Sequence, residues 1–213
     1  MVTGEGKLRG AIRGYVLAGG ASSRFGSDKA LAKLGRETVL SRACRLLEAV
    51  SDIVQVVAKT ERYPHFQEKI IEDRWPGAGP LGGIITALLD TAEVKGGSQW
   101  NLIVSCDMPF LTHDWLSYMT ERALACDAEV VVAQTEHRLE PLCACWRTSA
   151  LGKLRGAFDE GVRKVTDAMK QLHMEVLDET HWKRFDSAER LFWNMNTQQD
   201  YEEAVRIWTT ENA

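Results

Sequence analysis

Short apolar segments alternate with amphipathic segments along most of this chain, and this alternation restricts the fold more than any other feature of the sequence. Short continuous apolar runs are typical of buried strands, whereas apolar residues that recur three or four positions apart are typical of helices. Strands are predicted at 12–17, 53–57, 69–71, 101–105, 129–133, 142–146 and 174–177. Helices are predicted at 39–50, 81–89, 115–125, 149–158, 165–172 and 200–208. The pattern favours an α/β fold with a mostly parallel sheet, in which ligands bind beyond the carboxyl ends of the strands.

The chain is long enough for one large domain. Its 213 residues contain no internal repeat, low-complexity tract or long linker, and domains have on the order of 100 to 200 residues. We expect residues 1–11, which are polar and contain glycine, to form a flexible extension and residues 12–213 to form one domain. The apolar run that follows residue 11 is too short for a secretion signal or a membrane span, so we expect a cytoplasmic protein.

Charge and cysteine content exclude several classes of protein. The chain has 26 Lys and Arg against 30 Asp and Glu, a net charge of −4, which argues against a broad surface for nucleic acid or anionic membranes. The five cysteines form no C-x-x-C pair, and neither they nor the five histidines show the spacing of a zinc site. We therefore expect reduced thiols, and any bound metal should be a hard, oxygen-bound ion.

The first predicted strand leads into a glycine-rich segment that runs from Leu17 to Lys29. Gly19 and Gly20 allow backbone N–H groups to approach an anion, while Arg24 and Lys29 supply the positive charge that a triphosphate requires. The segment lacks the Gly-Lys-Ser/Thr of a Walker A loop, and its adjacent glycines differ from the dinucleotide fingerprint. The alternative is an exposed turn with solvated charges; we favour phosphate binding.

Two aspartates follow later predicted strands. Asp107 comes after the strand at 101–105, where it can hold Mg²⁺ against substrate phosphates, since this ion usually takes one or two carboxylates and phosphate oxygens. The alternative for Asp107 is a turn or helix-capping role. Asp73 comes after the strand at 69–71 and is placed to reach a base, a ribose or the metal. The glycine run at 77–83 then leads into a helix, whose first amides favour anions.

Two asparagines precede the last predicted helix. Asn194 and Asn196 are two positions apart, so on an extended segment both amides would face one ligand or metal. The alternative is that Asn196 or Thr197 only caps the helix.

Four motifs in this order resemble the nucleotidyltransferases of molybdenum cofactor biosynthesis, and among them the guanylyltransferases. The motifs are L-A-G-G-x-S-x-R-F-G-x-D-K, G-P-L-G-G, C-D-M-P and N-x-N-T, and the similarity extends over residues 14–206. The first motif is shared with sugar-phosphate and other nucleotidyltransferases, whereas the whole set is more specific. The resemblance implies a Rossmann-like fold of the glycosyltransferase-A type, with a mostly parallel sheet sandwiched by helices. It also implies a reaction of GTP with molybdenum-loaded molybdopterin that yields the guanine dinucleotide cofactor and pyrophosphate.

The resemblance also implies roles for individual residues. It assigns phosphate contacts and catalysis to Arg24, Lys29 and Asp107, with Mg²⁺ bound at Asp107, and pterin-side contacts to Asn194 and Asn196. It favours GTP because cytidylyltransferase relatives have L-A-A-G where this chain has L-A-G-G. Nucleotide contacts are expected at Leu17, Ala18, Gly19, Gly20, Lys29, Asp73, Gly82, Gly83 and Asp107.

The two halves of the domain are expected to differ in role. We expect a nucleotide-binding half at about 12–110 and an acceptor-binding half at about 111–213. Trp182 and Trp193 lie in the second half, where core packing is favoured over stacking on the pterin. At Glu140 the chain departs from the glutamine or histidine that relatives have before the following proline, so no acceptor contact is assigned to it.

Two other functions remain alternatives. One is a related nucleotidyltransferase that uses CTP or another phosphorylated acceptor, which base and acceptor trials would distinguish. The other is a GTP-binding adaptor without turnover, against which the presence of both Lys29 and Asp107 speaks. The expected partners are GTP and molybdenum-molybdopterin, together with proteins that deliver the cofactor and molybdoenzymes that receive it. We expect a monomer that binds neither nucleic acid nor membranes.

Overall fold

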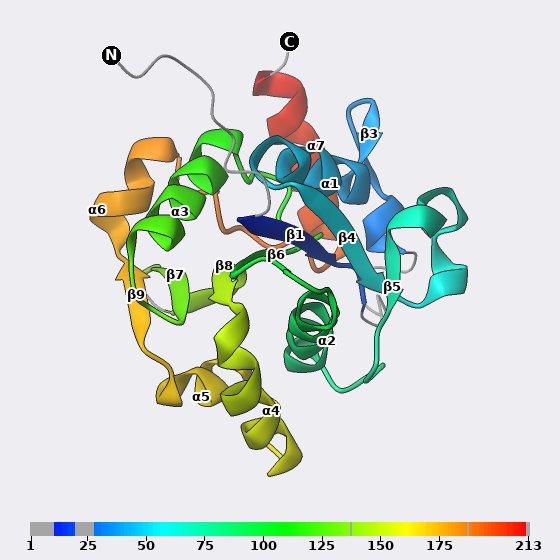
Figure 1. The fold of residues 1–213 in the computed structure, drawn as a ribbon. Helices are drawn as coiled ribbons and strands as arrows, with labels where there is room; N and C mark the ends of the chain where they lie inside the picture. The colour runs from blue at the N-terminus through cyan, green and yellow to red at the C-terminus, as the bar shows by residue number, and fades with distance from the viewer. Residues whose placement is uncertain (1–10, 20–27, 137, 187, 212–213) are drawn as a thin grey trace, which may run out of the picture.

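The computed structural model of this chain describes residues 11–19, 28–136, 138–186 and 188–211. Within these residues seven strands form the main sheet, in the order β5-β4-β1-β6-β8-β7-β9 (Figure 1). Strand β8 runs antiparallel to its neighbours β6 and β7, and the other pairs are parallel. The sheet is therefore mostly parallel, as predicted. The strands are β1 Ile12–Leu17, β4 Ile53–Ala58, β5 Ile70–Glu72, β6 Trp100–Ser105, β7 Val130–Gln134, β8 Leu139–Arg147 and β9 Met174–Leu177.

Helices cover both faces of the sheet. Figure 1 shows α2, α4 and α5 on one side and α1, α3 and α6 on the other. This arrangement is the α/β sandwich that the sequence predicts. The helices are α1 Val39–Val50, α2 Pro80–Glu93, α3 His113–Ala125, α4 Leu151–Asp159, α5 Val165–Ala168, α6 Glu179–Trp182 and α7 Gln198–Glu211.

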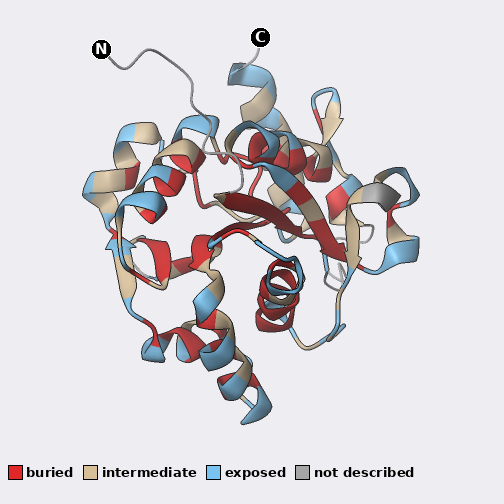
Figure 2. Ribbon diagram, in the orientation of Figure 1, coloured by how far each residue is buried: buried red, intermediate tan, exposed pale blue. Residues whose placement is uncertain are grey.

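The two central strands are buried on both faces. Every residue of β1 and β6 is buried, which explains why their sequences are continuous apolar runs rather than alternating ones. Successive side chains point to opposite faces, so Val16 and Val104 belong to the core under α1 and α3, while Tyr15 and Ile103 belong to the core under α2 and α4. Figure 2 shows the buried residues concentrated in the sheet and on the inward sides of the helices.

Several local features differ from the sequence prediction, and the short helix α6 at Glu179–Trp182 is one that was not predicted. Strand β8 is longer than the predicted 142–146, and the short turn after β7 requires it to return antiparallel. The predicted helix at 165–172 is α5 followed by a 3₁₀ turn at Met169–Gln171. A small hairpin, β2 Lys33–Leu34 and β3 Glu37–Thr38, was not predicted; Gly35 turns it with a φ of +64°.

The C-terminal segment packs beside the chain that follows β6. Tyr201 of α7 donates a hydrogen bond to the carbonyl of Lys33 in the hairpin, at 3.0 Å. Met195 is buried with Phe110, and its backbone N–H donates to the carbonyl of Asp107 at 2.9 Å. Thr197 caps α7, because its hydroxyl accepts from the N–H of Asp200. The N-M-N-T segment is thereby fixed next to Asp107.

The thiols and the C-terminal tryptophans pack as the sequence suggests. All five cysteines are free, and Cys143 and Cys145 are buried in the same face of the core. Trp182 is 3% exposed and donates from Nε1 to the carbonyl of Gln134, so its role is core packing. Trp193 stacks on Phe110 with ring centroids 5.5 Å apart. Among the residues described, no helix has the length and hydrophobicity needed to cross a membrane.

Replacing Gly14 with alanine should destabilise the protein. A Cβ at this position of β1 would lie 2.7 Å from Ser51 Oγ and 3.1 Å from Leu47 Cβ, and this overpacking should cost about 1–3 kcal/mol. The matched control is Gly152→Ala in α4, where a Cβ would meet nothing within 4 Å. This variant should stabilise the helix by about 0.5–1 kcal/mol. Urea unfolding of both variants measures these changes, and equal midpoints would refute the close packing of α1 on β1.

Candidate active site

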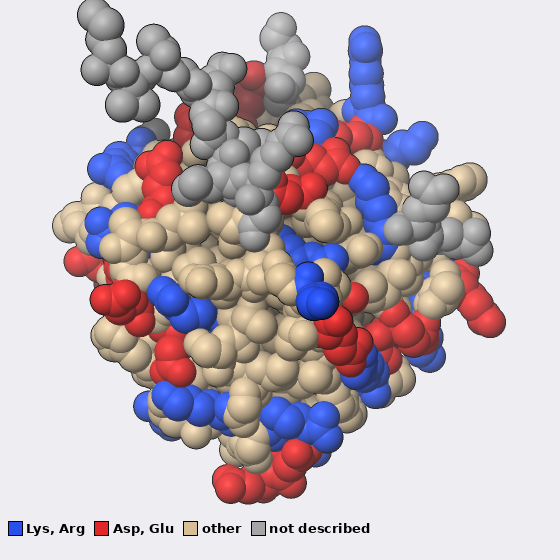
Figure 3. All heavy atoms as spheres, viewed as in Figure 1, with Lys and Arg blue, Asp and Glu red and all other residues tan. Residues whose placement is uncertain are grey.

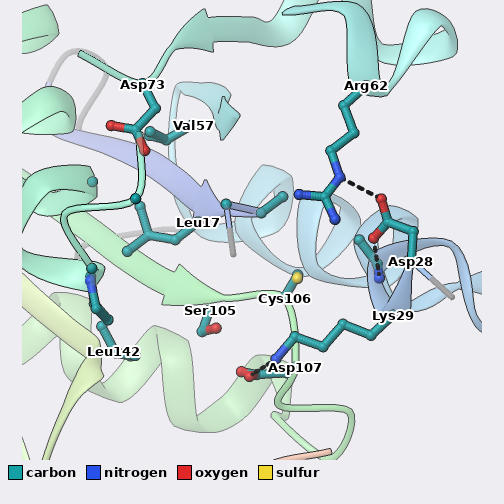
Figure 4. A pocket seen from close by; sticks show the side chains of 17 residues that line it. Leu17, Asp28, Lys29, Val57, Arg62, Asp73, Ser105, Cys106, Asp107 and Leu142 are labelled. Atoms are coloured by element: carbon teal, nitrogen blue, oxygen red, sulfur yellow. Dashed lines mark hydrogen bonds and ion pairs between the residues drawn. The ribbon is translucent and has the colours of Figure 1, made fainter. Parts of the chain in front are cut away.

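A pocket of about 390 Å³ lies at the carboxyl ends of β1, β4 and β6 (Figure 4). The candidate site residues of the sequence analysis follow predicted strands, and parallel strands all end at the same edge of the sheet. The pocket therefore lies where these residues were expected. Leu17 and Ala18 come from the end of β1, and Ser105, Cys106 and Asp107 from the end of β6. The other lining residues are Gly19, Asp28, Lys29, Ala30, Val57, Arg62, Asp73, Gly77, Gly79, Pro80, Gly83 and Leu142.

An ion pair closes one side of the pocket. Lys29 Nζ lies 2.5 Å from Asp107 Oδ2 and 3.5 Å from Asn196 Oδ1. Asp107 is 8% exposed, and in the described part of the chain its other oxygen, Oδ1, is buried without a hydrogen-bond partner. An unpartnered buried carboxylate oxygen is costly, and a bound cation would satisfy it.

The donor set at this position fits Mg²⁺ rather than zinc. Within the described ranges, no group of three His, Cys, Asp or Glu side chains is arranged to hold a metal. A metal at Asp107 would therefore take most of its ligands from substrate and water. Mg²⁺ is commonly bound in this way, by one or two carboxylates together with phosphate oxygens.

Asp73 lies across the pocket from Lys29 and Asp107 (Figure 4). Its Oδ1 accepts a hydrogen bond from the N–H of Trp75 at 3.0 Å, which fixes the carboxylate in the turn after β5. A Cβ added to Gly19 would lie 3.6 Å from Asp73 Oδ2. The glycine therefore keeps the space beside this oxygen open for a ligand.

The N-terminus of α2 forms another wall of the pocket. Gly77 and Gly79 have φ values of +86° and +83°, which only glycine adopts without strain, and Pro80 is the first residue of the helix. A Cβ on Gly83 would lie 3.3 Å from Leu17 Cδ2. The glycines thus bring the positive end of the helix dipole close to the end of β1.

Sequence reasoning missed three residues that join two sides of the pocket. Asp28 Oδ2 accepts from Arg62 Nε at 2.6 Å, and Asp28 Oδ1 lies 3.2 Å from the hydroxyl of Tyr63. Arg62 and Tyr63 follow β4, so the rule that informative residues follow strands could have found them. Asp28 is part of the D-K pair of the first motif and precedes Lys29 directly.

The structure brings most of the predicted site residues together. Gly82 does not line the pocket; a Cβ there would lie 3.2 Å from Trp75 Cβ, so this glycine serves close packing. The amide of Asn194 donates to the carbonyl of Phe192, whereas Asn196 reaches Lys29, so the two amides contact different groups. Gly20 and Arg24 lie outside the described residues. Leu17, Ala18, Gly19, Lys29, Asp73, Gly83 and Asp107 all line the pocket.

Glu140 lies outside the pocket lining. It is 4% exposed and accepts from Arg138 Nε at 2.8 Å. Burial raises the pKa of this carboxyl above its usual range. It is hydrogen-bonded to Arg138 and Thr135 of its own hairpin.

The match to a family model, together with the α/β fold, defines the class of the protein, an α/β nucleotidyltransferase. The chain superposes with a TM-score of 0.78 on the crystal structure of molybdopterin-guanine dinucleotide biosynthesis protein A from Archaeoglobus fulgidus, at 22% identity, covering 93% of this chain and 99% of that one. The chain belongs to the family of MobA-like NTP transferase domains, whose model matches residues 14–174.

Curated relatives cover nearly the whole chain. A probable molybdenum cofactor guanylyltransferase from Chloroflexus aggregans is 31% identical over 195 residues, which is 89% of this chain and 91% of that protein. A protein of the same name from Clostridium perfringens is 29% identical over 198 residues, or 90% of this chain and 94% of that protein.

The thiol in the pocket should be inert. Cys106 is 4% exposed, and burial raises its pKa to about 12, so it stays protonated at pH 8. Iodoacetamide should therefore label the partly exposed Cys126 in the native protein and leave Cys106 unmodified, as mass spectrometry of the digest would measure. Labelling in urea is the control, because all five thiols should then react. Equal labelling of Cys106 and Cys126 in the native protein would contradict this burial.

Proposed function

We propose that this chain transfers GMP from GTP to molybdenum-loaded molybdopterin, forming the guanine dinucleotide cofactor and releasing pyrophosphate. Membership of the MobA-like family and the names of the two curated relatives support this reaction. The observation that carries the proposal is the Lys29–Asp107 pair in the pocket at the carboxyl edge of the sheet, where, within the described residues, Asp107 Oδ1 is buried without a hydrogen-bond partner.

The pocket suggests how GTP is oriented. Its base or ribose lies at the Asp73 side, and its phosphates lie at the side of Lys29 and Asp107. The carboxylate of Asp73, which lines the pocket near Gly19, supports a guanine there, because a carboxylate accepts two parallel hydrogen bonds and the edge of guanine offers adjacent N–H groups. The proposed nucleotide contacts are the predicted residues that line the pocket, together with Gly20 and Arg24, which lie outside the described residues; Gly82 is not among them.

The reaction is a substitution at the α-phosphorus of GTP. A terminal phosphate oxygen of molybdopterin forms a new bond to this phosphorus, and the bond to the oxygen bridging the α- and β-phosphates breaks. Both reactants are anions, so catalysis consists mainly of positioning and charge neutralisation. Lys29 neutralises phosphate charge, the N-terminus of α2 adds backbone donors, and Asn196 contacts the acceptor side next to Lys29. Asp107 holds Mg²⁺, which supplies charge neutralisation and polarises phosphate oxygens.

The remaining expectations on cell location and assembly stay predictions. The cytoplasmic location, the monomeric state, and the delivery and recipient proteins are expected from the sequence and its resemblance. Where Figure 3 shows the surface, Lys and Arg are intermixed with Asp and Glu rather than gathered in one basic patch.

Nucleotide binding should stabilise the protein selectively. A ligand at 100 times its Kd adds about 2.7 kcal/mol to the free energy of unfolding. Thermal unfolding with GTP, CTP and ATP, each with and without Mg²⁺, should give the largest shift for GTP with Mg²⁺. A preference for CTP would instead support the cytidylyltransferase alternative, and binding of GTP without pyrophosphate release in the presence of molybdopterin would support the adaptor.

The variant Asp107→Asn should lower turnover by about a hundredfold or more, because the neutral amide weakens the cation site and loses the charge that pairs with Lys29. Pyrophosphate release at saturating Mg²⁺ measures this. Asp114→Asn is the matched control, since the side chain of Asp114 is 82% exposed on α3 and its loss should leave turnover unchanged. Wild-type turnover of Asp107→Asn would remove Asp107 from the proposed role.

A further inference from the structure

Arg62 is a cation of the pocket to which the proposed function gives no role. It ends the 3₁₀ turn Thr60–Arg62 that follows β4, and it lines the pocket with a side chain that is 29% exposed. Figure 4 shows its guanidinium reaching into the pocket on the side of Asp28 and Lys29, away from Asp73.

The position of Arg62 is fixed by Asp28. The carboxylate of Asp28 holds Arg62 through Nε at 2.6 Å and accepts a hydrogen bond from the N–H of Ala30 at 3.1 Å. The neighbouring Tyr63 is 1% exposed, and its hydroxyl lies 3.1 Å from the carbonyl of Ala18 and 3.2 Å from Asp28 Oδ1. The turn that carries Arg62 is therefore attached to both the end of β1 and the start of the Lys29 segment.

The charges of the pocket suggest what Arg62 binds. Two cations are found among the described lining residues, and each is paired with a carboxylate: Lys29 with Asp107, and Arg62 with Asp28. A triphosphate brings several negative charges, and both of these cations line the end of the pocket where the phosphates are proposed to lie. A guanidinium has five donors in a planar fork, and a bond from Nε to a carboxylate is compatible with a phosphate contact from its other nitrogens.

We propose that Arg62 binds the terminal phosphates of the nucleotide, the part that leaves as pyrophosphate, and that Asp28 is the positioning residue that orients it. This inference rests on the proposed function, because it takes the phosphates to lie at the Lys29 side of the pocket. Arginine suits this role better than lysine, since its fork contacts carboxylate and phosphate at once.

Calorimetric titration with GTP, GDP and GMP in the presence of Mg²⁺ tests the proposal. Arg62→Gln should raise the Kd for GTP on the order of tenfold, the effect of losing a charge-assisted contact, and leave the Kd for GMP unchanged. Arg62→Lys keeps the positive charge but lacks the planar fork of donors. It should lose less affinity for GTP than Arg62→Gln and none for GMP, so it tests the proposal even if Arg62→Gln does not fold. Arg45→Gln is the matched control, because Arg45 pairs with Glu37 at 2.6 Å outside the pocket lining.

The role of Asp28 is tested in the same titration. Asp28→Asn should lower the affinity for GTP but not the affinity for GMP. The double variant Asp28→Asn with Arg62→Gln should lose no more affinity for GTP than Arg62→Gln alone, because Asp28 acts through Arg62. A larger loss in the double variant would overturn this positioning role.

Other outcomes overturn the assignment of Arg62. Unchanged GTP affinity in both Arg62 variants, or equal losses for GTP and GMP, would remove Arg62 from the terminal phosphates while the wild type still binds GTP. A wild-type protein that binds none of the three nucleotides would overturn the proposed function and this inference together.

Discussion

Strand β1 is hydrogen-bonded on both edges and buried on both faces, and the pocket depends on this arrangement. The pairing continues past the end of the strand: the N–H of Ala18 donates to the carbonyl of Val57, and the N–H of Cys106 donates to the carbonyl of Leu17. Three strands therefore end in register around one space. Because their backbone positions are set by the sheet, the residues that follow them are held without any need for a rigid loop.

Four of the charged residues that line the pocket form two ion pairs. Lys29 and Asp107 are 78 positions apart in sequence, and Asp28 and Arg62 are 34 apart, so each pair also joins separate segments of the wall. Buried or half-buried charges are expensive to leave alone. Each cation of these two pairs is therefore compensated by a carboxylate of the pocket itself.

The alternation of strand and helix predicted the fold class well, since buried parallel strands have a distinctive continuous apolar pattern. The placement of Asp73 and Asp107 followed from the rule on strand ends. The direction of β8 was not predicted, because apolar pattern alone does not say which way a strand runs. The contact of Asn194 could not be predicted for a related reason, because where a polar side chain points is decided by its tertiary neighbours, here Phe192. The same rule on strand ends could have found Arg62 after β4, but not its pairing with Asp28.

The hydrogen bond from Met195 to Asp107 uses backbone atoms at both ends. Any residue other than proline at position 195 retains the donor, whereas the side chain of Met195, fully buried beside Phe110, holds the segment by packing. The two segments are thus joined twice, once through the main chain and once through a buried side chain, and only the second contact depends on which residue stands at position 195.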